Sequence, residues 1–416
     1  MGAPGASAAG TRSTVDELAR FVTDLAGRGG FSGTVRLVQD GRLAFGTTLG
    51  EAVPELRGTA LDPLTLHQLL TNTAALPEVA PGRCVRSGRA GYPAGMTSIG
   101  YFLSCEQYGP RELVAQARAA ERAGFRRLWI SDHFHPWNDA QGQSPFVWSV
   151  LGALSEAVSL PITTAVTCPT VRIHPAVLAQ AAATAAVQLD GRFVLGVGSG
   201  EALNEHILGD PWPSAGQRLE MLEEAVEVIR KLHAAGARGE AVSHHGTHYE
   251  VQDARIYTVP DRPVPIYVSG FGPQATKLAG RIGDGYCTVV PDADLVRTFR
   301  EAGGGDKPVQ AGMKVCWDAD AGAALDRAHR LWANDVLPGQ LAQILPRPED
   351  FEAATSFVPR EDVGEAIVCG DDPKAHAERV RQYVDAGVDE IYVQQVGADH
   401  EGFFRGWQEH VLPEFH

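Results

Sequence analysis

The chain has 416 residues, of which 44% are hydrophobic and 21% are charged, and its formal net charge is −15 at pH 7. This composition is typical of a globular protein with one large domain and an additional segment. The negative charge argues against nucleic-acid and anionic-membrane partners. The sequence contains no apolar run of the ~18 residues that a membrane span needs, and its first residues do not resemble a secretory signal. A cytoplasmic location is therefore expected.

The six cysteines form no Cys-x-x-Cys pair, and most lie in or beside apolar runs. We expect them to be small buried side chains in a reducing compartment, in preference to disulfides or a zinc site. His133 and His135 are two residues apart, a spacing that does not by itself bring both imidazoles onto one metal. His244, His245 and His248 lie in an irregular insert, where a surface position explains them. No metal site is expected.

Residues 1–95 differ in pattern from the rest of the chain. A helix is expected at residues 14–26, a hairpin around Asp40-Gly41 and a second helix at residues 64–77. This succession resembles the opening of serine beta-lactamase-like hydrolases. However, the first lysine of the chain is Lys231, so the Ser-x-x-Lys motif that activates the nucleophile of these enzymes is absent from the segment.

We interpret residues 1–95 as a non-catalytic extension, a truncated hydrolase-like remnant that ends in a linker rich in glycine, proline and arginine. A serine hydrolase acting through this segment is a remote alternative. Met96 would be a natural start for the remainder of the chain, so an upstream fragment or a wrongly set start is a further explanation for the extension.

From residue 98 onward, short apolar runs alternate with amphipathic helical patterns. Strands are expected at residues 98–104, 128–130, 161–167, 193–197, 264–268, 285–290, 309–316, 366–369 and 390–395. Helices are expected at residues 111–123, 146–157, 175–189, 219–232, 273–281, 293–302, 321–332, 373–386 and 402–410. Residues 242–262 are expected to form an irregular insert with short strands, and residues 337–360 a proline-rich insert. About eight strand–helix units predict a (β/α)8 TIM barrel with insertions at residues 96–416, preceded by the small extension.

Polar residues and glycines follow five of the predicted strands. These segments are Ser104–Gln107, Asp132–Trp137, Thr167–Thr170, Gly198–Glu201 and Ser269–Gly272. Because the C-terminal ends of barrel strands meet at one face, where the active sites of TIM barrels lie, these segments are expected to converge. An acid, two imidazoles and an indole released by one strand end suit proton chemistry. A histidine-rich surface loop is the alternative, and the convergence favours a functional site.

Two of these segments, Gly198–Glu201 and Gly270–Gly272, place glycines between a strand and a helix. Without a Cβ, the backbone N–H groups at a helix start can approach a phosphate closely. Glycine at such a turn is also common for steric reasons alone. Neither segment matches the G-x-G-x-x-G fingerprint, and the sequence has no Walker loop.

Residues 97–416 resemble the luciferase-like family of barrel oxidoreductases, more narrowly the coenzyme F420-dependent branch related to F420-dependent glucose-6-phosphate dehydrogenase. The motifs that carry the resemblance are Cys105–Gln107, Ser131–Trp137, Thr167–Arg172, Leu195–Glu205 and Ala279–Gly285. The resemblance implies a hydride-transfer enzyme in which His133 is the base. It also implies that Glu201 is an acid or hydrogen-bond partner near the deazaflavin edge, that Trp137 shapes the pocket, and that Glu106 lines the substrate side.

The resemblance further implies the residues that bind coenzyme F420. Asp132 would contact the deazaflavin, and a non-proline cis peptide would lie between Ala165 and Val166. The remaining expected contacts are Ser199, Gly200 and Asn204 for the cofactor, and Gly270, Phe271 and Gly272 for its phosphate. His135 would be a structural residue. FMN on the same barrel, in a monooxygenase, is the alternative cofactor, and a homodimer is expected.

The sequence departs from the sugar-phosphate branch at the expected phosphate ligands of the substrate. In that branch two lysines and an arginine hold this phosphate, and they align near Asp292, Ala342 and Glu365, none of which is basic. Arg172, Lys277 and Arg281 are candidate replacements. The expected substrate is therefore an alcohol or a sugar phosphate, and the sequence does not identify which.

Overall fold

The computed structural model describes residues 97–415. The predictions for residues 1–95, including the hydrolase-like remnant and the linker, lie outside the described residues. The domain boundary near residue 96 therefore stays a prediction.

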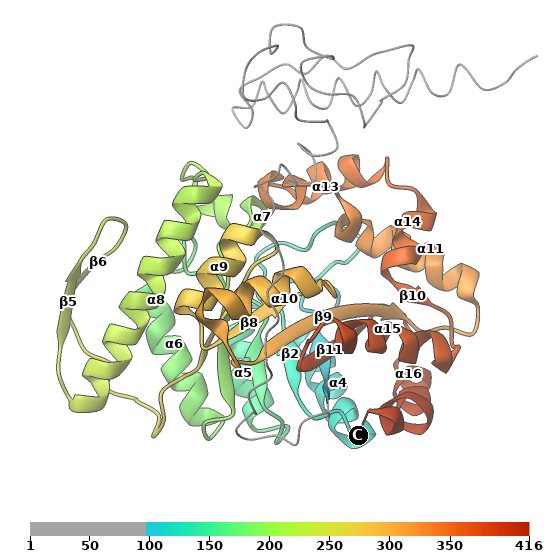
Figure 1. Ribbon diagram of the computed structural model, residues 1–416, viewed down its shortest axis with the longest axis horizontal. Helices are drawn as coiled ribbons and strands as arrows, with labels where there is room; N and C mark the ends of the chain where they lie inside the picture. The colour runs from blue at the N-terminus through green and yellow to red at the C-terminus, as the bar shows by residue number, and fades with distance from the viewer. Residues whose placement is uncertain (1–96, 416) are drawn as a thin grey trace, which may run out of the picture. The chain divides into compact units, whose positions relative to one another are not determined.

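The described chain forms a closed barrel of parallel strands surrounded by helices (Figure 1), which confirms the predicted fold class. The strands of the ring are β1 (Ser98–Leu103), β2 (Leu128–Ile130), β3 (Ile162–Thr164), β4 (Phe193–Val197), β7 (Ile266–Ser269), β8 (Gly285–Thr288), β9 (Val309–Cys316) and β11 (Glu390–Gln395). Neighbours in this order pair in parallel, and β9 pairs with both β8 and β11, which closes the ring. The strand ends predicted to converge therefore lie on one face.

The longer helices cover the outside of the barrel, as the apolar spacing predicted. They are α4 (Pro110–Ala123), α5 (Val147–Ser155), α6 (Pro175–Gln188), α8 (Ala215–Arg238), α9 (Pro273–Ile282), α10 (Ala293–Phe299), α11 (Ala321–Trp332), α15 (Pro373–Asp385) and α16 (His400–Gly406). Shorter helical turns are α7 (Ala202–Glu205), η2 (His206–Leu208), η3 (Arg300–Gly304), η4 (Ala333–Val336), η5 (Trp407–Val411) and η6 (Leu412–Glu414). Proline begins α4, α6, α9 and α15, where its missing N–H costs no helical hydrogen bond.

The insert after α8 forms the two-stranded hairpin β5 (Val242–His245) and β6 (Glu250–Ala254), which lies beside α8 in Figure 1. Glu224 of α8 fixes the hairpin turn, because its carboxylate accepts hydrogen bonds from the N–H groups of Thr247, His248 and Tyr249. It also lies 3.2 Å from His244 Nε2. The insert is therefore held to α8 by a carboxylate, and His244 takes part in that contact.

The proline-rich insert predicted at residues 337–360 is largely helical. The region contains the helices α12 (Leu341–Ile344) and α13 (Pro348–Thr355), and α14 (Arg360–Ala366) follows. Its prolines mislead because they start helices: Pro348 lies in the first turn of α13, and Pro359 is the N-cap of α14. The strand expected at residues 366–369 is only β10 (Val368–Cys369), which pairs with the end of β9 and lies outside the ring.

The barrel is filled near the beginnings of its strands by a buried network of polar and aromatic side chains. The rings of Trp129 and Tyr392 stack at 4.6 Å between centroids. Trp129 Nε1 donates to Gln310 Oε1 at 2.8 Å, and Gln310 Nε2 donates to Glu390 Oε2 at 2.7 Å. Arg127 lies 3.4 Å from the other oxygen of Glu390. These side chains fill the barrel near the beginnings of its strands. Their polar atoms form hydrogen bonds or ion pairs with one another.

We expect Gln310→Leu to lower the free energy of unfolding by about 2–4 kcal/mol, because the change removes a partner from a buried carboxylate and from a buried indole. Urea unfolding followed by tryptophan fluorescence measures this. Gln252→Leu, on the exposed face of the hairpin, is the matched control and is expected to change stability by less than about 0.5 kcal/mol. Equal unfolding midpoints for the two variants would contradict a supporting role for the network.

Candidate active site

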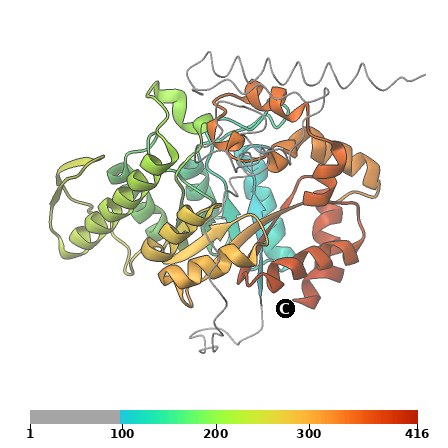
Figure 2. The same ribbon diagram turned by 45° about the horizontal axis from the view of Figure 1, so that its top comes forward.

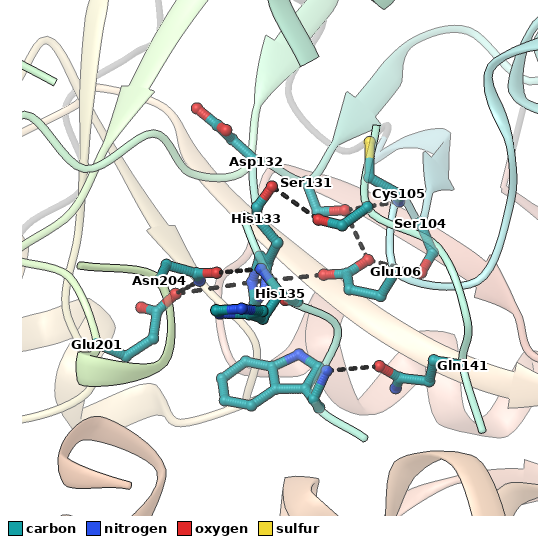
Figure 3. Close-up of polar contacts among 12 residues, drawn as sticks. Ser104, Cys105, Glu106, Ser131, Asp132, His133, His135, Gln141, Glu201 and Asn204 are labelled. Atoms are coloured by element: carbon teal, nitrogen blue, oxygen red, sulfur yellow. Dashed lines mark hydrogen bonds and ion pairs between the residues drawn. The ribbon is translucent and has the colours of Figure 1, made fainter. Parts of the chain in front are cut away.

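His133 lies between two carboxylates at the C-terminal face of the barrel (Figure 3). Its Nε2 is 3.4 Å from Glu106 Oε1 and 3.7 Å from Glu201 Oε1. Its Nδ1 is 3.1 Å from the carbonyl oxygen of His135. Because a carbonyl oxygen only accepts, Nδ1 carries hydrogen and Nε2 of the neutral ring is the basic atom. A proton taken up at Nε2 would be stabilised by both carboxylates.

Glu106 is oriented by two serine hydroxyls. Ser104 Oγ and Ser131 Oγ each donate to Glu106 Oε2 at 2.7 Å, and the carboxylate is buried. These serines come from the ends of β1 and β2, so neighbouring strands fix one oxygen of the acid. The other oxygen, Oε1, remains directed at His133 (Figure 3).

The loop after β2 is held by the single helical turn α7. Asn204 Oδ1 accepts from the N–H groups of Phe134 and His135 at 2.8 and 3.1 Å, and its Nδ2 donates to Glu201. His135 Nδ1 donates to the carbonyl oxygen of Leu203 at 2.9 Å. The Asn204 side chain is buried among these protein groups, and its expected contact with the cofactor stays a prediction. His135 has the structural role expected of it.

Trp137 packs beside His133 and against a helix that was not predicted from the sequence. Its ring centroid is 5.0 Å from that of His133, and 5.1 Å from that of Phe351 on α13. The loop is also tied to α11, since Asn138 and Gln141 both donate to the carbonyl oxygen of Leu331. Figures 1 and 2 both place α13 at the same end of the barrel as α7. Phe351 was missed because its segment was described only as a proline-rich insert.

Asp132 faces away from His133 into a buried ion-pair network. Thr167 Oγ1 donates to Asp132 Oδ2 at 2.7 Å, and Arg172 Nη2 donates to Asp132 Oδ1 at 3.0 Å. Arg172 Nε is 3.6 Å from Glu205 Oε1. We call Asp132, Arg172 and Glu205 the buried triad. Burial raises the pKa of Glu205 to about 7, against the opposing effect of its contacts with Arg172.

The residues expected around the cofactor lie at the ends of β3, β4 and β7. The peptide bond between Ala165 and Val166 is cis, as predicted. A Cβ on Gly198 would lie 2.7 Å from Val166 Cγ2, so the glycine is required for close packing there. Ser199 and Gly200 follow it at half-buried positions before α7. Sequence and structure thus agree on where these residues meet, and their contacts with a cofactor stay a prediction.

The segment Gly270–Gly272 precedes the N-terminus of α9. A Cβ on Gly270 would lie 2.8 Å from the carbonyl carbon of Ala275, whereas one on Gly272 would meet nothing within 4 Å. No side chain caps the helix, and Phe271 is 53% exposed. The first N–H groups of α9, which begin after Pro273, therefore have no side-chain cap, and such a donor set fits a phosphate.

Arg172 and Arg281, two of the candidate replacements for the substrate-phosphate ligands, are paired with carboxylates. Arg172 is committed to the buried triad, and Arg281 lies 2.9 Å from Glu223 on the outer surface. Asp292 caps α10, where it accepts from the N–H groups of Asp294 and Leu295. Asp292 and Arg172 thus have structural partners of their own.

Within residues 97–415, no group of three or more His, Cys, Asp or Glu side chains is placed to hold a metal ion. Across the same residues, no helix is long and apolar enough to cross a membrane.

Comparisons with known proteins cover the whole barrel. A family model described as luciferase-like monooxygenase matches residues 96–390. The chain is 37% identical over 331 residues to F420-dependent glucose-6-phosphate dehydrogenase from Beutenbergia cavernae, covering 76% of this chain and 97% of the relative. It is 38% identical over 330 residues to the enzyme of the same name from Microbacterium testaceum, covering 76% and 96%.

Two solved structures share the fold. An F420-dependent secondary alcohol dehydrogenase in complex with an F420-acetone adduct is 31% identical with a TM-score of 0.72, and the match covers 77% of this chain and 99% of that one. A coenzyme F420-dependent tetrahydromethanopterin reductase from Methanopyrus kandleri is 22% identical, with a TM-score of 0.61 over 77% of this chain and 100% of that one.

We expect Glu205→Gln to alter the pH dependence of stability. Glu205 has a pKa of about 7 in the folded chain, above the ~4.3 of an exposed glutamate. The folded chain thus holds this proton more tightly, and its stability falls as pH rises between these two values. The Glu205→Gln variant has no carboxyl group at this position and therefore does not lose stability in this way as pH rises. Its stability relative to the parent chain should therefore rise by on the order of 3 kcal/mol across the interval, since each pKa unit corresponds to ~1.4 kcal/mol.

Thermal unfolding at pH values from about 4 to about 8 measures this difference. Glu240→Gln removes an exposed carboxylate that pairs with Arg238, and is the control, expected to give a flat difference. A flat difference for Glu205→Gln as well would contradict the raised pKa.

Proposed function

The chain belongs to the luciferase-like monooxygenase family and is an F420-dependent oxidoreductase, and we propose that it moves a hydride between the hydroxyl-bearing carbon of an alcohol and the deazaflavin. The observation that carries the proposal is the approach of His133 Nε2 to both Glu106 and Glu201. Coenzyme F420, when bound, supplies a hydride acceptor that has carbon where flavin has its reactive nitrogen. The protein then needs a base, a means of orienting the alcohol and a dry pocket.

His133 takes the hydroxyl proton at Nε2 in this proposal. The Nδ1–H bond to the carbonyl of His135 fixes the tautomer and the ring orientation. Glu106 and Glu201 stabilise the imidazolium, and in the reverse direction the same proton returns to a carbonyl oxygen. Trp137 and the helix α13 behind it exclude water from one side of the base.

We assign the cofactor contacts as the sequence predicted them, with two changes. The loop Gly270–Gly272 and the start of α9 would hold the phosphate, and Ala165, Val166, Ser199 and Gly200 would line the ring. Asp132 would contact the ring through its main chain, because its carboxylate is buried against Arg172. Asn204 would act indirectly, by holding Glu201 and the loop after β2.

An uncharged alcohol is favoured over a sugar phosphate as the substrate. Two of the positions aligned with phosphate ligands of the sugar-phosphate branch carry acids, Asp292 and Glu365, which would repel a dianion. Arg172, the buried candidate replacement, is already paired with Asp132 and Glu205. The 31% identical structure is named as a secondary alcohol dehydrogenase, whereas the relatives at 37–38% identity are named for glucose 6-phosphate, so this proposal rests on the acids and on the pairing of Arg172.

We expect His133→Ala to lower kcat by about 10²–10⁴-fold, the usual contribution of general base catalysis, while the Kd for F420 changes little. Loss of F420 absorbance with a panel of simple alcohols and glucose 6-phosphate measures turnover. His245→Ala, in the exposed hairpin, is the control and should retain activity. Full turnover by His133→Ala would rule out its role as the base.

Titration with F420 and with FMN tests the cofactor in the same preparation. The family description favours FMN-dependent oxygenation as the second candidate. Tight FMN binding without F420 binding, together with oxygen consumption in the presence of reduced flavin, would overturn the proposal in favour of that alternative.

We further propose that the chain forms a homodimer through the outer face of α5 and α6. A groove there is lined mainly by apolar residues, and Phe134, Phe146 and Val177 beside it are about half or more exposed. An apolar surface of this kind is typical of a protein interface. We expect Val177→Glu to shift the chain from dimer to monomer in light scattering, whereas Tyr257→Glu in the insert should not. A dimer that persists in Val177→Glu would exclude this face.

A further inference from the structure

The buried triad joins the ends of three neighbouring barrel strands. Asp132 follows β2, Arg172 lies in the segment after β3, and Glu205 ends α7 after β4. The side chains of Asp132 and Glu205 have no exposed surface, and that of Arg172 is 7% exposed. Two carboxylates share one guanidinium, so the triad carries a net negative charge when both are ionised. Removing Arg172 would leave both acids buried without a cation.

Each carboxylate of the triad is next to a part of the candidate active site. Asp132 directly precedes His133, and Arg172 Nη2 contacts the carbonyl oxygen of Asp132 at 3.5 Å as well as its carboxylate. Glu205 directly follows Asn204, which holds the loop of His133 and donates to Glu201. The triad therefore adjoins both the loop after β2, which carries His133, and the turn α7, which holds Glu201.

Glu205 also fixes the backbone around Arg172. Its Oε2 accepts from the N–H of Arg172 at 2.6 Å and from the N–H of Val171 at 3.2 Å. Tyr249 of the hairpin adds a bond to the same segment, since its hydroxyl contacts the carbonyl oxygens of Pro169 and Thr170. The main chain of Arg172 is thus fixed by contacts that do not involve Asp132. These contacts limit where the guanidinium can lie.

We propose that Arg172 is a positioning residue for the hydride transfer, and that its charge sets the distance between His133 and the carboxylate of Glu201. This inference rests on the proposed function only for its effect on rate. A planar guanidinium reaches both acids at once, which the single ammonium of lysine does not. Without it, repulsion and hydration of the two acids would displace Asp132 and, with it, His133. A displacement of about 1 Å can lower a rate by about 10²-fold.

The triad lies apart from the proposed phosphate site. That site is formed by Gly270–Gly272 and α9, and none of the triad's hydrogen bonds or ion pairs described above involves these residues. The loss of Arg172 is therefore expected to affect kcat much more than the Kd for F420. A residue that only supported the fold would lower both together with the melting temperature.

The test compares Arg172→Met and Arg172→Lys with the parent chain in the presence of F420 and an alcohol substrate. We expect kcat to fall by about 10²-fold in Arg172→Met and by less in Arg172→Lys, with the Kd for F420 within about threefold of the parent. Added guanidinium ion should restore part of the kcat of Arg172→Met. Arg192→Met is the matched control, because Arg192 is a half-buried arginine bonded to the carbonyls of Val158 and Leu160 at the other end of the strands.

A second readout does not depend on turnover. The rate at which diethyl pyrocarbonate modifies His133, followed by peptide mass spectrometry, should change at least about threefold in Arg172→Met and remain unchanged in Arg192→Met. If the parent chain fails to use F420, the proposed function fails and this rate alone tests the positioning. If Arg172→Met does not fold, it is replaced in the test by the double variant Arg172→Met/Glu205→Gln. The second change removes one of the two buried acids that would lack a cation.

An unchanged kcat, where the parent turns over, or an unchanged rate of His133 modification in a folded Arg172 variant overturns the inference. So does a loss of F420 affinity as large as the loss of kcat. Reduced kcat with retained F420 binding, altered His133 reactivity and rescue by guanidinium supports it.

Discussion

The candidate site depends on one buried amide. The loop after β2 has no regular hydrogen bonding of its own, and Asn204 accepts two of its N–H groups through a single oxygen. Buried backbone donors need such partners, so the loop can take this course only where the amide is present. Asn204 in turn belongs to the single turn α7, between Glu201 and Glu205. The positions of His133, Glu201 and Glu205 therefore all depend on the same four-residue turn.

Much of the fold follows from local pattern. The strands at residues 128–130, 193–197, 309–316 and 390–395 have the predicted bounds, because a polar residue or a glycine follows each of them within two residues. The meeting of Glu106, His133 and Glu201 was also predictable in outline. Parallel strands of one barrel direct their C-terminal ends to one face, so residues far apart in sequence arrive together.

Other features depend on contacts that the sequence does not encode locally. The helix α13 was missed because its segment was described only as a proline-rich insert, although proline is compatible with a first turn. The sequence did not predict that the Asp132 side chain turns towards Thr167 and towards Arg172, a residue 40 positions away. Its expected contact with the deazaflavin stays a prediction. Arg172 itself was considered as a phosphate ligand. Only the three-dimensional neighbourhood identifies its two carboxylate partners.

The network of Gln310, Trp129, Tyr392 and Glu390 closes the barrel near the beginnings of its strands. Molecules therefore cannot pass through the centre of the ring, and everything that reacts must enter and leave on one side. Two molecules that bind one above the other on this side must therefore bind in a fixed order. The partner that lies deeper must arrive first and leave last, so the sequence of binding events is a property of the architecture as well as of the affinities.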